Sequence, residues 1–288
     1  MKRSAASTVT GDNSAEIARA FTTARRDARP LPGFPGAIPA DLAGSYAIQD
    51  QALDQWGEAP VGWKVGRIAP DLQGRLGEAR VAGPVFARNR WLSIPGQVLD
   101  VPVFVGGFAA VEGEFVYRLG ADAPAGKTAW TAAEALDLAD GLFVGVEIAG
   151  SPLATINALG PLVVASDFGN NWGLILGPAI DGWRSRPFDS LTCRTSIDGA
   201  LVGTGSAADL PDGPAEAFAW LLGHCAARGR PLKAGDLVTT GAVTGVHDIV
   251  AGQTARIDFG AFGEILCRAK PAGPIGEEET THEQRDRG

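Results

Sequence analysis

The chain has 288 residues, of which 45% are hydrophobic, so it can bury a full core as one large domain or as a domain with a small lobe. Its formal net charge of -8 excludes the basic surface that is typical of a nucleic-acid-binding domain. No apolar run reaches the ~20 residues that a membrane-spanning helix needs, so we expect no membrane segment.

The first 90 residues predict a small α/β lobe. Residues 1–13 are small and polar, and no apolar segment follows their basic start, so we expect a disordered head and no signal peptide. Ser14 and Asp41 are residue types that cap helices. Apolar residues follow each of them, which predicts helices at about 14–26 and 41–56. A short apolar run that contains two glycines predicts a strand at 61–66. We take residues 14–90 as the lobe.

Strand signals dominate the rest of the chain. Runs rich in β-branched and aromatic residues predict strands at 108–119, 142–149, 173–177, 192–197, 237–240 and 254–259. Two helices are predicted between these strands. One is predicted at 131–138, where Thr131 and Glu134 form a capping-box pattern, and the other at 214–228, which starts at Pro214, a typical first helical residue. We take residues 91–271 as a larger β-rich domain and expect the charged tail 272–288 to be disordered.

The cysteines and histidines argue against disulfides and zinc. Three cysteines lie far apart, without the spacing of a metal site, at 193, 225 and 267. Their odd number favours a reduced, cytoplasmic protein. Only three histidines are present, which makes a His-rich zinc site an unfavourable interpretation.

Glu112 and Glu114 lie two residues apart within the predicted strand 108–119. Side chains alternate along a strand, so both carboxylates project from one face, where they repel each other. A hard divalent cation such as Mg²⁺ or Mn²⁺ is the natural partner, because it prefers oxygen ligands. A solvated strand edge with two surface glutamates is the alternative, and the spacing alone favours that alternative.

A third carboxylate, Glu147, lies inside an apolar run in the predicted strand 142–149. Buried acids are rare unless they are paired or bound to metal. Three acids from two strands can occupy one face of an octahedral metal site and leave room for water and a chelating substrate. A salt bridge from Glu147 to an arginine explains the same pattern equally well.

Lys64 lies between Trp63 and Val65 on a short apolar strand. A desolvated lysine has a lowered pKa and can act in acid–base chemistry, or it can stay charged and bind a carboxylate. A surface lysine that buries only its aliphatic stem is the alternative.

A set of short motifs occurs in an order and spacing that resemble the fumarylacetoacetate hydrolase superfamily. The resemblance is to its branch of 2-oxopent-4-enoate hydratases and 2-oxo-3-hexenedioate decarboxylases, and it runs from about Ile17 to Arg268. Each motif alone is weak, and the signal lies in the ordered set at 47–49, 62–66, 111–114, 145–148, 165–167, 174–177, 217–221, 232–236 and 240–241.

This resemblance implies an α+β fold, a roll or sandwich of mixed β-sheet of the fumarylacetoacetate hydrolase C-terminal type, so that 91–271 would be the catalytic domain. It implies that Glu112, Glu114 and Glu147 bind Mg²⁺ or Mn²⁺, and that the carboxylate and 2-oxo oxygen of a substrate chelate the metal. Such a metal withdraws electrons from the substrate and supports hydration, decarboxylation or carbon–carbon cleavage.

The resemblance also implies roles for three further residues. Lys64 matches a lysine proposed for acid–base chemistry or carboxylate binding. Asp167 matches an acidic residue near the pocket of hydratases, with a turn aspartate as the alternative. Thr244 matches a hydroxyl position in a loop that contacts the substrate carboxylate, with a plain turn threonine as the alternative.

The sequence departs from the family pattern around the expected pocket. Glu78 lacks the proline that usually follows an acidic residue there, and Arg80 adds a cation nearby. Trp172 follows a run that replaces smaller residues. We expect these changes to reshape the distal pocket. His247 lies in a loop near the rim and is a candidate for proton transfer, although a surface-loop histidine is the simpler interpretation.

We therefore expect a metal-dependent lyase, a hydratase that acts on a small 2-oxo or 2-hydroxydienoic acid in aromatic catabolism. A decarboxylase is the first alternative and would need Arg80 or Arg67 for a second carboxylate. An acylpyruvate hydrolase is the second and would need His247 or Glu78 as a base. A non-catalytic partner subunit is a further alternative. The family implies a homo-oligomer, with association to a related hydratase or decarboxylase subunit as an extension.

Overall fold

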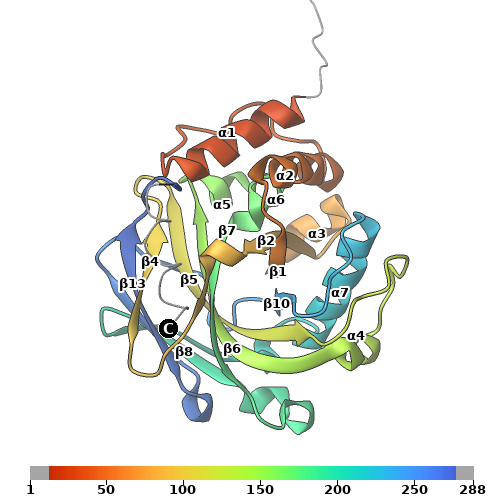
Figure 1. Ribbon diagram of the computed structural model, residues 1–288, viewed down its shortest axis with the longest axis vertical. Helices are drawn as coiled ribbons and strands as arrows, with labels where there is room; N and C mark the ends of the chain where they lie inside the picture. The colour runs from red at the N-terminus through yellow and green to blue at the C-terminus, as the bar shows by residue number, and fades with distance from the viewer. Residues whose placement is uncertain (1–12, 277–288) are drawn as a thin grey trace, which may run out of the picture.

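The computed structural model describes residues 13–276, in which two mixed β-sheets pack together and helices cover the larger one (Figure 1). The larger, eight-stranded sheet has the order β2-β1-β10-β5-β6-β7-β3, and β11 pairs with β5 outside this path. Its strands are β1 (Pro60–Arg67), β2 (Arg80–Phe86), β3 (Arg90–Leu92), β5 (Phe108–Leu119), β6 (Ala139–Ser151), β7 (Asn171–Ala179), β10 (Leu237–Thr239) and β11 (His247–Asp248).

The smaller, five-stranded sheet has the order β4-β13-β12-β8-β9. Its strands are β4 (Val98–Val103), β8 (Thr192–Ile197), β9 (Ala200–Ser206), β12 (Thr254–Asp258) and β13 (Glu264–Pro271). Both sheets mix directions, since β1 with β10, β3 with β7 and β4 with β13 are parallel while the other pairs are antiparallel. The expected α+β fold with mixed β-sheets is thereby confirmed.

Helices occupy the connections between the strands. The α-helices are α1 (Ser14–Arg26), α2 (Leu42–Trp56), α3 (Pro70–Leu76), α4 (Ala132–Leu138), α5 (Ile156–Leu159), α6 (Pro161–Ser166) and α7 (Pro214–Ala227). Short 3-10 helices lie at Ala87–Asn89, Phe168–Asn170, Trp183–Ser185, Phe188–Ser190, Ala207–Asp209 and Gly260–Phe262. Within residues 13–276, no helix is both long enough and apolar enough to span a bilayer.

The helix caps mostly follow the sequence. Asp41 accepts a hydrogen bond from the backbone N–H of Gly44 at the start of α2, and Thr131 with Glu134 forms the predicted capping box of α4. Pro214 is the first residue of α7. The prediction for α1 is wrong by one residue, because Ser14 is the first helical residue and Asn13 holds the cap position.

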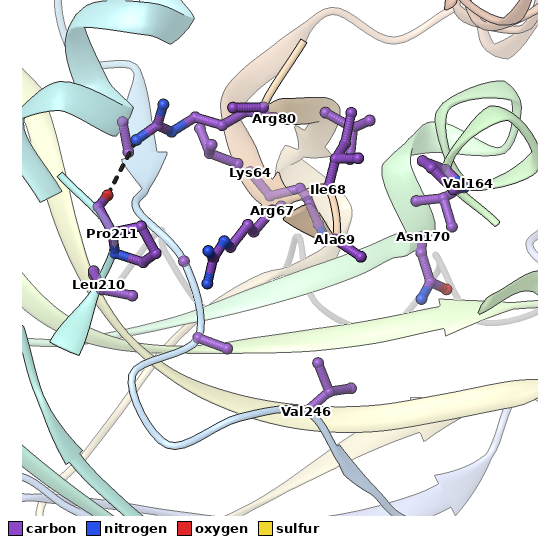
Figure 2. A pocket seen from close by; sticks show the side chains of 18 of the residues that line it. Lys64, Arg67, Ile68, Ala69, Arg80, Val164, Asn170, Leu210, Pro211 and Val246 are labelled. Atoms are coloured by element: carbon purple, nitrogen blue, oxygen red, sulfur yellow. Dashed lines mark hydrogen bonds between the residues drawn. The ribbon is translucent and has the colours of Figure 1, made fainter. Parts of the chain in front are cut away.

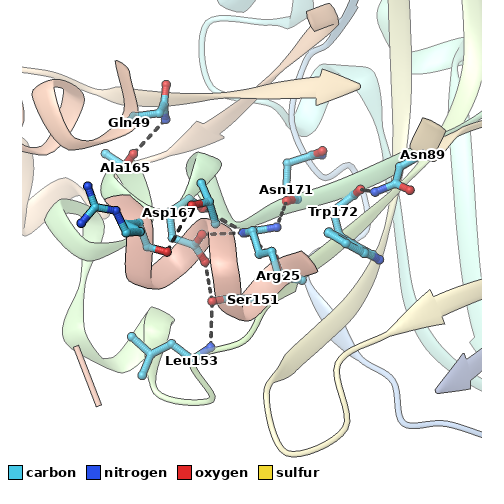
Figure 3. Close-up of polar contacts among 12 residues, drawn as sticks. Arg25, Gln49, Asn89, Ser151, Leu153, Ala165, Asp167, Asn171 and Trp172 are labelled. Carbon is cyan, nitrogen blue, oxygen red and sulfur yellow. Dashed lines mark hydrogen bonds and ion pairs between the residues drawn. The ribbon is translucent and has the colours of Figure 1, made fainter. Parts of the chain in front are cut away.

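A buried ion pair ties α1 to the larger sheet (Figure 3). The guanidinium of Arg25 pairs with Asp167 and donates to the backbone oxygens of Asn171 and Gly150. The second carboxylate oxygen of Asp167 accepts from the hydroxyl of Ser151, 2.6 Å away. Arg25 is 1% exposed, so these bonds replace its water and compensate its buried charge.

The proposed boundary at residue 90 crosses the larger sheet. Strands β1 and β2 come from the expected lobe 14–90, yet β1 pairs with β10 and thus joins the strands of the expected domain 91–271. The expected disordered segments 1–13 and 272–288 lie outside the described residues, apart from residue 13 and residues 272–276.

Candidate metal centre

Three glutamates meet on neighbouring strands at the centre of the larger sheet. Glu112 on β5 is the direct cross-strand partner of Glu147 on β6, and Glu114 lies two residues along on the same face. Each of the three offers a carboxylate oxygen within 4.8 Å of the other two. The structure thus brings together the three acids that the sequence analysis singled out.

Gly113 explains why the two glutamates of β5 can lie so deep. Its α-carbon faces the opposite side of β5, where a β-carbon would stand 2.5 Å from the sulfur of Cys193 and 3.0 Å from Ile257. Any side chain there would push β5 away from the smaller sheet. The close contact of the two sheets therefore needs glycine between the two acids.

Burial shapes the electrostatics of the cluster. Glu112 is 6% exposed and Glu114 and Glu147 are fully buried. Burial raises the pKa of Glu112 to about 8, with the nearby carboxylate of Glu147 adding to the effect and Lys64 opposing it. Burial and the other two carboxylates raise the pKa of Glu114 well above its usual value. The three acids are therefore unfavourable neighbours unless a positive charge joins them.

Lys64 supplies one such charge. It is 5% exposed on β1, and its Nζ lies 3.3 Å from Oε1 of Glu147. Burial alone would lower the pKa of Lys64, but the carboxylates, Glu147 foremost, outweigh it and raise that pKa. The lysine is thus held as an ammonium beside the acids.

Two carboxylate oxygens remain without partners. Oε2 of Glu114 accepts from the backbone N–H of Gly241 at 2.7 Å, and Oε1 of Glu147 accepts from Nδ2 of Asn171 at 3.1 Å. The other oxygens, Oε1 of Glu114 and Oε2 of Glu147, are buried and have no hydrogen-bond partner among the described residues. Buried unpaired oxygens are costly, and a hard divalent cation would satisfy them. The donor set therefore fits a divalent metal ion.

A cavity of about 760 Å³ leads from Lys64 and Glu112 to the surface. The walls include Ile68 from the segment after β1, Val164 from α6 and Val246 from the loop between β10 and β11 (Figure 2). This combination of apolar walls with a charged inner end is typical of a small-molecule site.

Two arginines line the outer part of this cavity. Arg80 donates to the backbone oxygen of Pro211 at 3.2 Å and lies 3.5 Å from a carboxylate oxygen of Asp212. Arg67 lines the same cavity, and among residues 13–276 it has no hydrogen-bond or ion-pair partner.

Two of the residues selected from the sequence lie elsewhere. Asp167 is 1% exposed, pairs with Arg25 and does not line the cavity. The hydroxyl of Thr244 lies 2.8 Å from that of Thr195 and is absent from the cavity wall, although its neighbour Gly245 belongs to it. Both side chains therefore have structural partners that account for them.

The two candidate bases are also engaged outside the cavity wall. A ring nitrogen of His247 lies 2.9 Å from the backbone oxygen of Thr244, and Glu78 accepts from the indole N–H of Trp220. Neither side chain lines the cavity.

Sequence reasoning missed two asparagines. Asn171 holds Glu147, and Asn170 lines the cavity with a buried amide oxygen that lacks a partner among the described residues. The sequence signal for them is their position as two adjacent polar residues directly before an apolar strand. They belong to the run before Trp172 that departs from the family pattern.

Comparisons with known proteins identify relatives of this chain. A family model described as fumarylacetoacetate (FAA) hydrolase C-terminal matches residues 79–270. The curated 2-keto-4-pentenoate hydratase of Paraburkholderia xenovorans (strain LB400) is 26% identical over 254 residues, which cover 87% of this chain and 92% of that protein. The 2-keto-4-pentenoate hydratase 3 of Pseudomonas putida matches to the same extent.

Solved structures share the fold. The 4-oxalocrotonate decarboxylase of Pseudomonas putida G7, complexed with magnesium and adipate, superposes with a TM-score of 0.73 at 19% identity, over 92% of this chain and all of that chain. A fumarylpyruvate hydrolase of Pseudomonas aeruginosa, in complex with Mn²⁺ and pyruvate, has a TM-score of 0.54 at 18% identity, over 73% of this chain and 89% of that one.

Proposed function

Because the chain belongs to the fumarylacetoacetate hydrolase family, we propose that it is a divalent-metal-dependent hydratase. It would add water to a 2-hydroxy-2,4-dienoate and give a 4-hydroxy-2-oxo acid, a reaction of aromatic catabolism. The observation that carries this proposal is the cluster of Glu112, Glu114 and Glu147, of which Glu112 lines the cavity together with the neighbouring Lys64. Its similarity to the two curated hydratases over most of the chain supports the choice among family reactions.

The three glutamates would hold the metal, Mg²⁺ or Mn²⁺. Once bound, the metal would supply a Lewis acid that draws electrons from the oxo group of the substrate. Glu114 accepts a hydrogen bond from the backbone N–H of Gly241, and Glu147 accepts one from the side chain of Asn171. These bonds fix the orientation of both carboxylates, so that the second oxygen of each is already in place to bind a metal ion. The carboxylates would therefore need little reorganisation when the metal binds.

Lys64 would move the proton. Conversion of the dienol to the conjugated 2-oxo-3-enoate takes a proton from the 2-hydroxyl and adds one at C5. Water then adds its oxygen to C4 and a proton to C3, which yields the 4-hydroxy-2-oxo acid. Lys64 is an ammonium at the cavity wall, so it can donate the proton to carbon and take one back from the hydroxyl.

A decarboxylase is the second candidate. The observation that favours it is the pair Arg67 and Arg80 in the cavity, which suits a substrate with a second carboxylate. An acylpyruvate hydrolase is less well supported, because His247 and Glu78 bond to other groups outside the cavity wall. The complete carboxylate set argues against a non-catalytic partner subunit. Assembly into a homo-oligomer stays a prediction from the family.

A paired assay with Mg²⁺ tests the proposal. One arm follows loss of the dienol absorbance of 2-hydroxypenta-2,4-dienoate, and the other follows release of CO₂ from 2-oxo-3-hexenedioate. Both arms are repeated with Glu114→Gln. We expect turnover in the first arm that disappears in the variant. Turnover confined to the second arm would replace the hydratase by a decarboxylase, and silence in both arms with metal bound would reject both.

A further inference from the structure

We propose that the side-chain amide of Asn170 binds the water that adds to C4 of the substrate and holds the new 4-hydroxyl group afterwards. This inference rests on the proposed function, because it assigns the water site of that hydration. It also has a consequence for binding alone, since the same amide would recognise the hydroxyl group of a 4-hydroxy-2-oxo acid.

Asn170 carries an unpaired acceptor in the wall of the cavity. Its side chain lines the cavity and is 4% exposed (Figure 2). Nδ2 of Asn170 donates to Oδ1 of Asn157 at 3.1 Å, and Asn157 lines the same cavity. Oδ1 of Asn170 is buried and has no hydrogen-bond partner among residues 13–276. An unpaired buried acceptor is costly, so this oxygen favours a small ligand that donates a hydrogen bond.

The backbone around Asn170 is held in an unusual conformation. Phe168, Gly169 and Asn170 have φ angles of 50°, 62° and 64°, so three consecutive residues lie in the left-handed region. Residues other than glycine persist there only where the surrounding structure fixes them, and such positions cluster at functional sites. Packing against β2 fixes this turn, because a β-carbon at Gly83 would collide with the backbone oxygen of Phe168.

The same turn joins the acceptor to the carboxylate cluster. The next residue, Asn171, donates from Nδ2 to Oε1 of Glu147 at 3.1 Å, and Nζ of Lys64 lies 3.3 Å from that oxygen. Asn170 and Lys64 line one cavity. A substrate that enters this cavity would therefore meet both an ammonium and a neutral acceptor.

These two groups differ in the way that hydration needs. An amide oxygen accepts a hydrogen bond without taking up the proton, so Asn170 would orient the water and leave it intact. In the addition, the water oxygen bonds to C4, and the electron pair of the C3=C4 bond takes a proton from the Lys64 ammonium at C3. The water returns one of its protons to Lys64. Its other proton stays on the new hydroxyl group, which donates to Oδ1 of Asn170.

Probes that differ by one hydroxyl group test this site by binding. They are 2-oxopentanoate and the two separate enantiomers of 4-hydroxy-2-oxopentanoate. Their Kd values are measured by calorimetry with the Mg²⁺-loaded protein. We expect one enantiomer to bind about fivefold more tightly than 2-oxopentanoate, which is the effect of one neutral hydrogen bond.

Variants locate the effect. Asn170→Gly removes the amide and suits the positive φ, so the turn can keep its shape. It should bring the Kd of the preferred enantiomer to within about twofold of that of 2-oxopentanoate, whose own Kd should stay nearly unchanged. Asn170→Asp keeps an acceptor oxygen in a residue type that tolerates this conformation, so it should retain the preference. Ala28→Gly is the matched control, because it changes another residue of positive φ outside the cavity wall and should keep the wild-type ratio.

A kinetic readout separates water binding from a merely structural role. With 2-hydroxypenta-2,4-dienoate, Asn170→Gly should lose the dienol absorbance at a rate within about threefold of the wild type. Formation of 4-hydroxy-2-oxopentanoate, followed by NMR, should fall about tenfold or more, because only this step uses the bound water. The conjugated 2-oxo-3-enoate should therefore accumulate. A structural defect would slow both steps together.

Four results would overturn the assignment: equal binding of all probes by the wild type, a preference unchanged in Asn170→Gly, a preference lost in Asn170→Asp or Ala28→Gly, or an equal fall of both rates in Asn170→Gly. The proposed function is judged separately. A hydroxyl preference that depends on Asn170, without hydration of the dienoate, would keep the hydroxyl site and reject the hydratase. Hydration without any hydroxyl preference would keep the hydratase and reject this role of Asn170.

Discussion

Glu112 and Glu147 face each other directly across the antiparallel pair of β5 and β6. Like charges in that position destabilise a sheet, and here both are buried. The two carboxylates therefore destabilise the centre of the sheet unless a cation lies between them. Metal binding, stability and activity should all depend on this arrangement.

Glu114→Gln should separate metal binding from folding. We expect Mn²⁺ affinity to fall at least tenfold, because one carboxylate ligand is lost. In a metal chelator, the variant should melt at the same temperature as the wild type or higher, since a neutral amide replaces an acid whose ionisation burial opposes. Calorimetric titration and thermal melts measure both properties. A variant that keeps its Mn²⁺ affinity would exclude Glu114 as a ligand.

Asn171→Leu should loosen the metal site without removing a ligand. Nδ2 of Asn171 donates to Oε1 of Glu147, so its loss frees the carboxylate to change rotamer. Loss of such supporting bonds typically weakens metal binding by about 10- to 100-fold. The readout is Mn²⁺ affinity at equal folded fraction, with Asn171→Asp as a second variant. Unchanged affinity in the leucine variant would show that Glu147 needs no support from Asn171.

Gly66→Ala should displace the ammonium of Lys64. A β-carbon at residue 66 would stand 3.3 Å from Nζ of Lys64 and 3.3 Å from a methyl group of Val81, so the lysine must shift. We expect kcat to fall about tenfold while Mn²⁺ affinity stays within about twofold, because proton transfer depends on position.

Gly74→Ala is the control for that change. Residue 74 lies on α3, and a β-carbon there would meet nothing within 4 Å, so activity should stay at the wild-type level. The helix should gain about 0.5–1 kcal/mol from the better helix former. A wild-type kcat in Gly66→Ala would contradict the role given to Lys64.

Asp167→Asn should act on stability more than on chemistry. The change leaves the buried guanidinium of Arg25 without its counter-charge, and breaking such a pair costs about 3–5 kcal/mol. At temperatures where the variant is folded, we expect kcat within a few-fold of the wild type. Chemical denaturation and steady-state kinetics at low temperature give the two values. A thousandfold loss of kcat with normal stability would return Asp167 to the catalytic residues.

His224 should make stability fall in acid. It stacks on Trp220 with ring centroids 4.6 Å apart, and burial together with Arg228 lowers its pKa to about 3. Between that value and the ~6.5 of an unfolded histidine, only the unfolded chain takes up the proton, so stability is complete above pH 6.5 and declines below it. At pH 5 the loss would be about 2 kcal/mol. His224→Phe should remove this part of the pH dependence in urea titrations at pH 7 and pH 5. An equal loss of unfolding free energy between pH 7 and pH 5 in both proteins would contradict this role of His224.

Local patterns predicted the longer helices, the strands β1, β5, β6, β7, β8, β10 and β12, and the shared face of Glu112 and Glu114, because strand alternation and helix caps are properties of neighbouring residues. They missed the strands β2, β3, β4, β9 and β13. The pairing of Glu112 with Glu147 depends on the register between β5 and β6, which neither strand contains by itself. The partner of Asp167 was invisible for the same reason, since Arg25 is 142 residues away in the sequence.

The lobe boundary at residue 90 shows a further limit. Neighbouring residues predict one short strand at 61–66 and no partner for it within the lobe. Its incorporation into the larger sheet results from β10, which arrives from residues 237–239 and pairs with β1 on one side and β5 on the other. Nothing in the local composition of either segment records that insertion.

The position of β10 also sets the order in which the protein can mature. As the ribosome extends the chain, both Lys64 and Glu147 emerge long before residues 237–241, which separate β1 from β5 and donate the Gly241 N–H to Glu114. Pairings between such distant segments form slowly, because a long loop must close first. A nascent chain halted before residue 237 would hold all three glutamates and still lack an assembled site, so we expect metal uptake to be one of the last events in its synthesis.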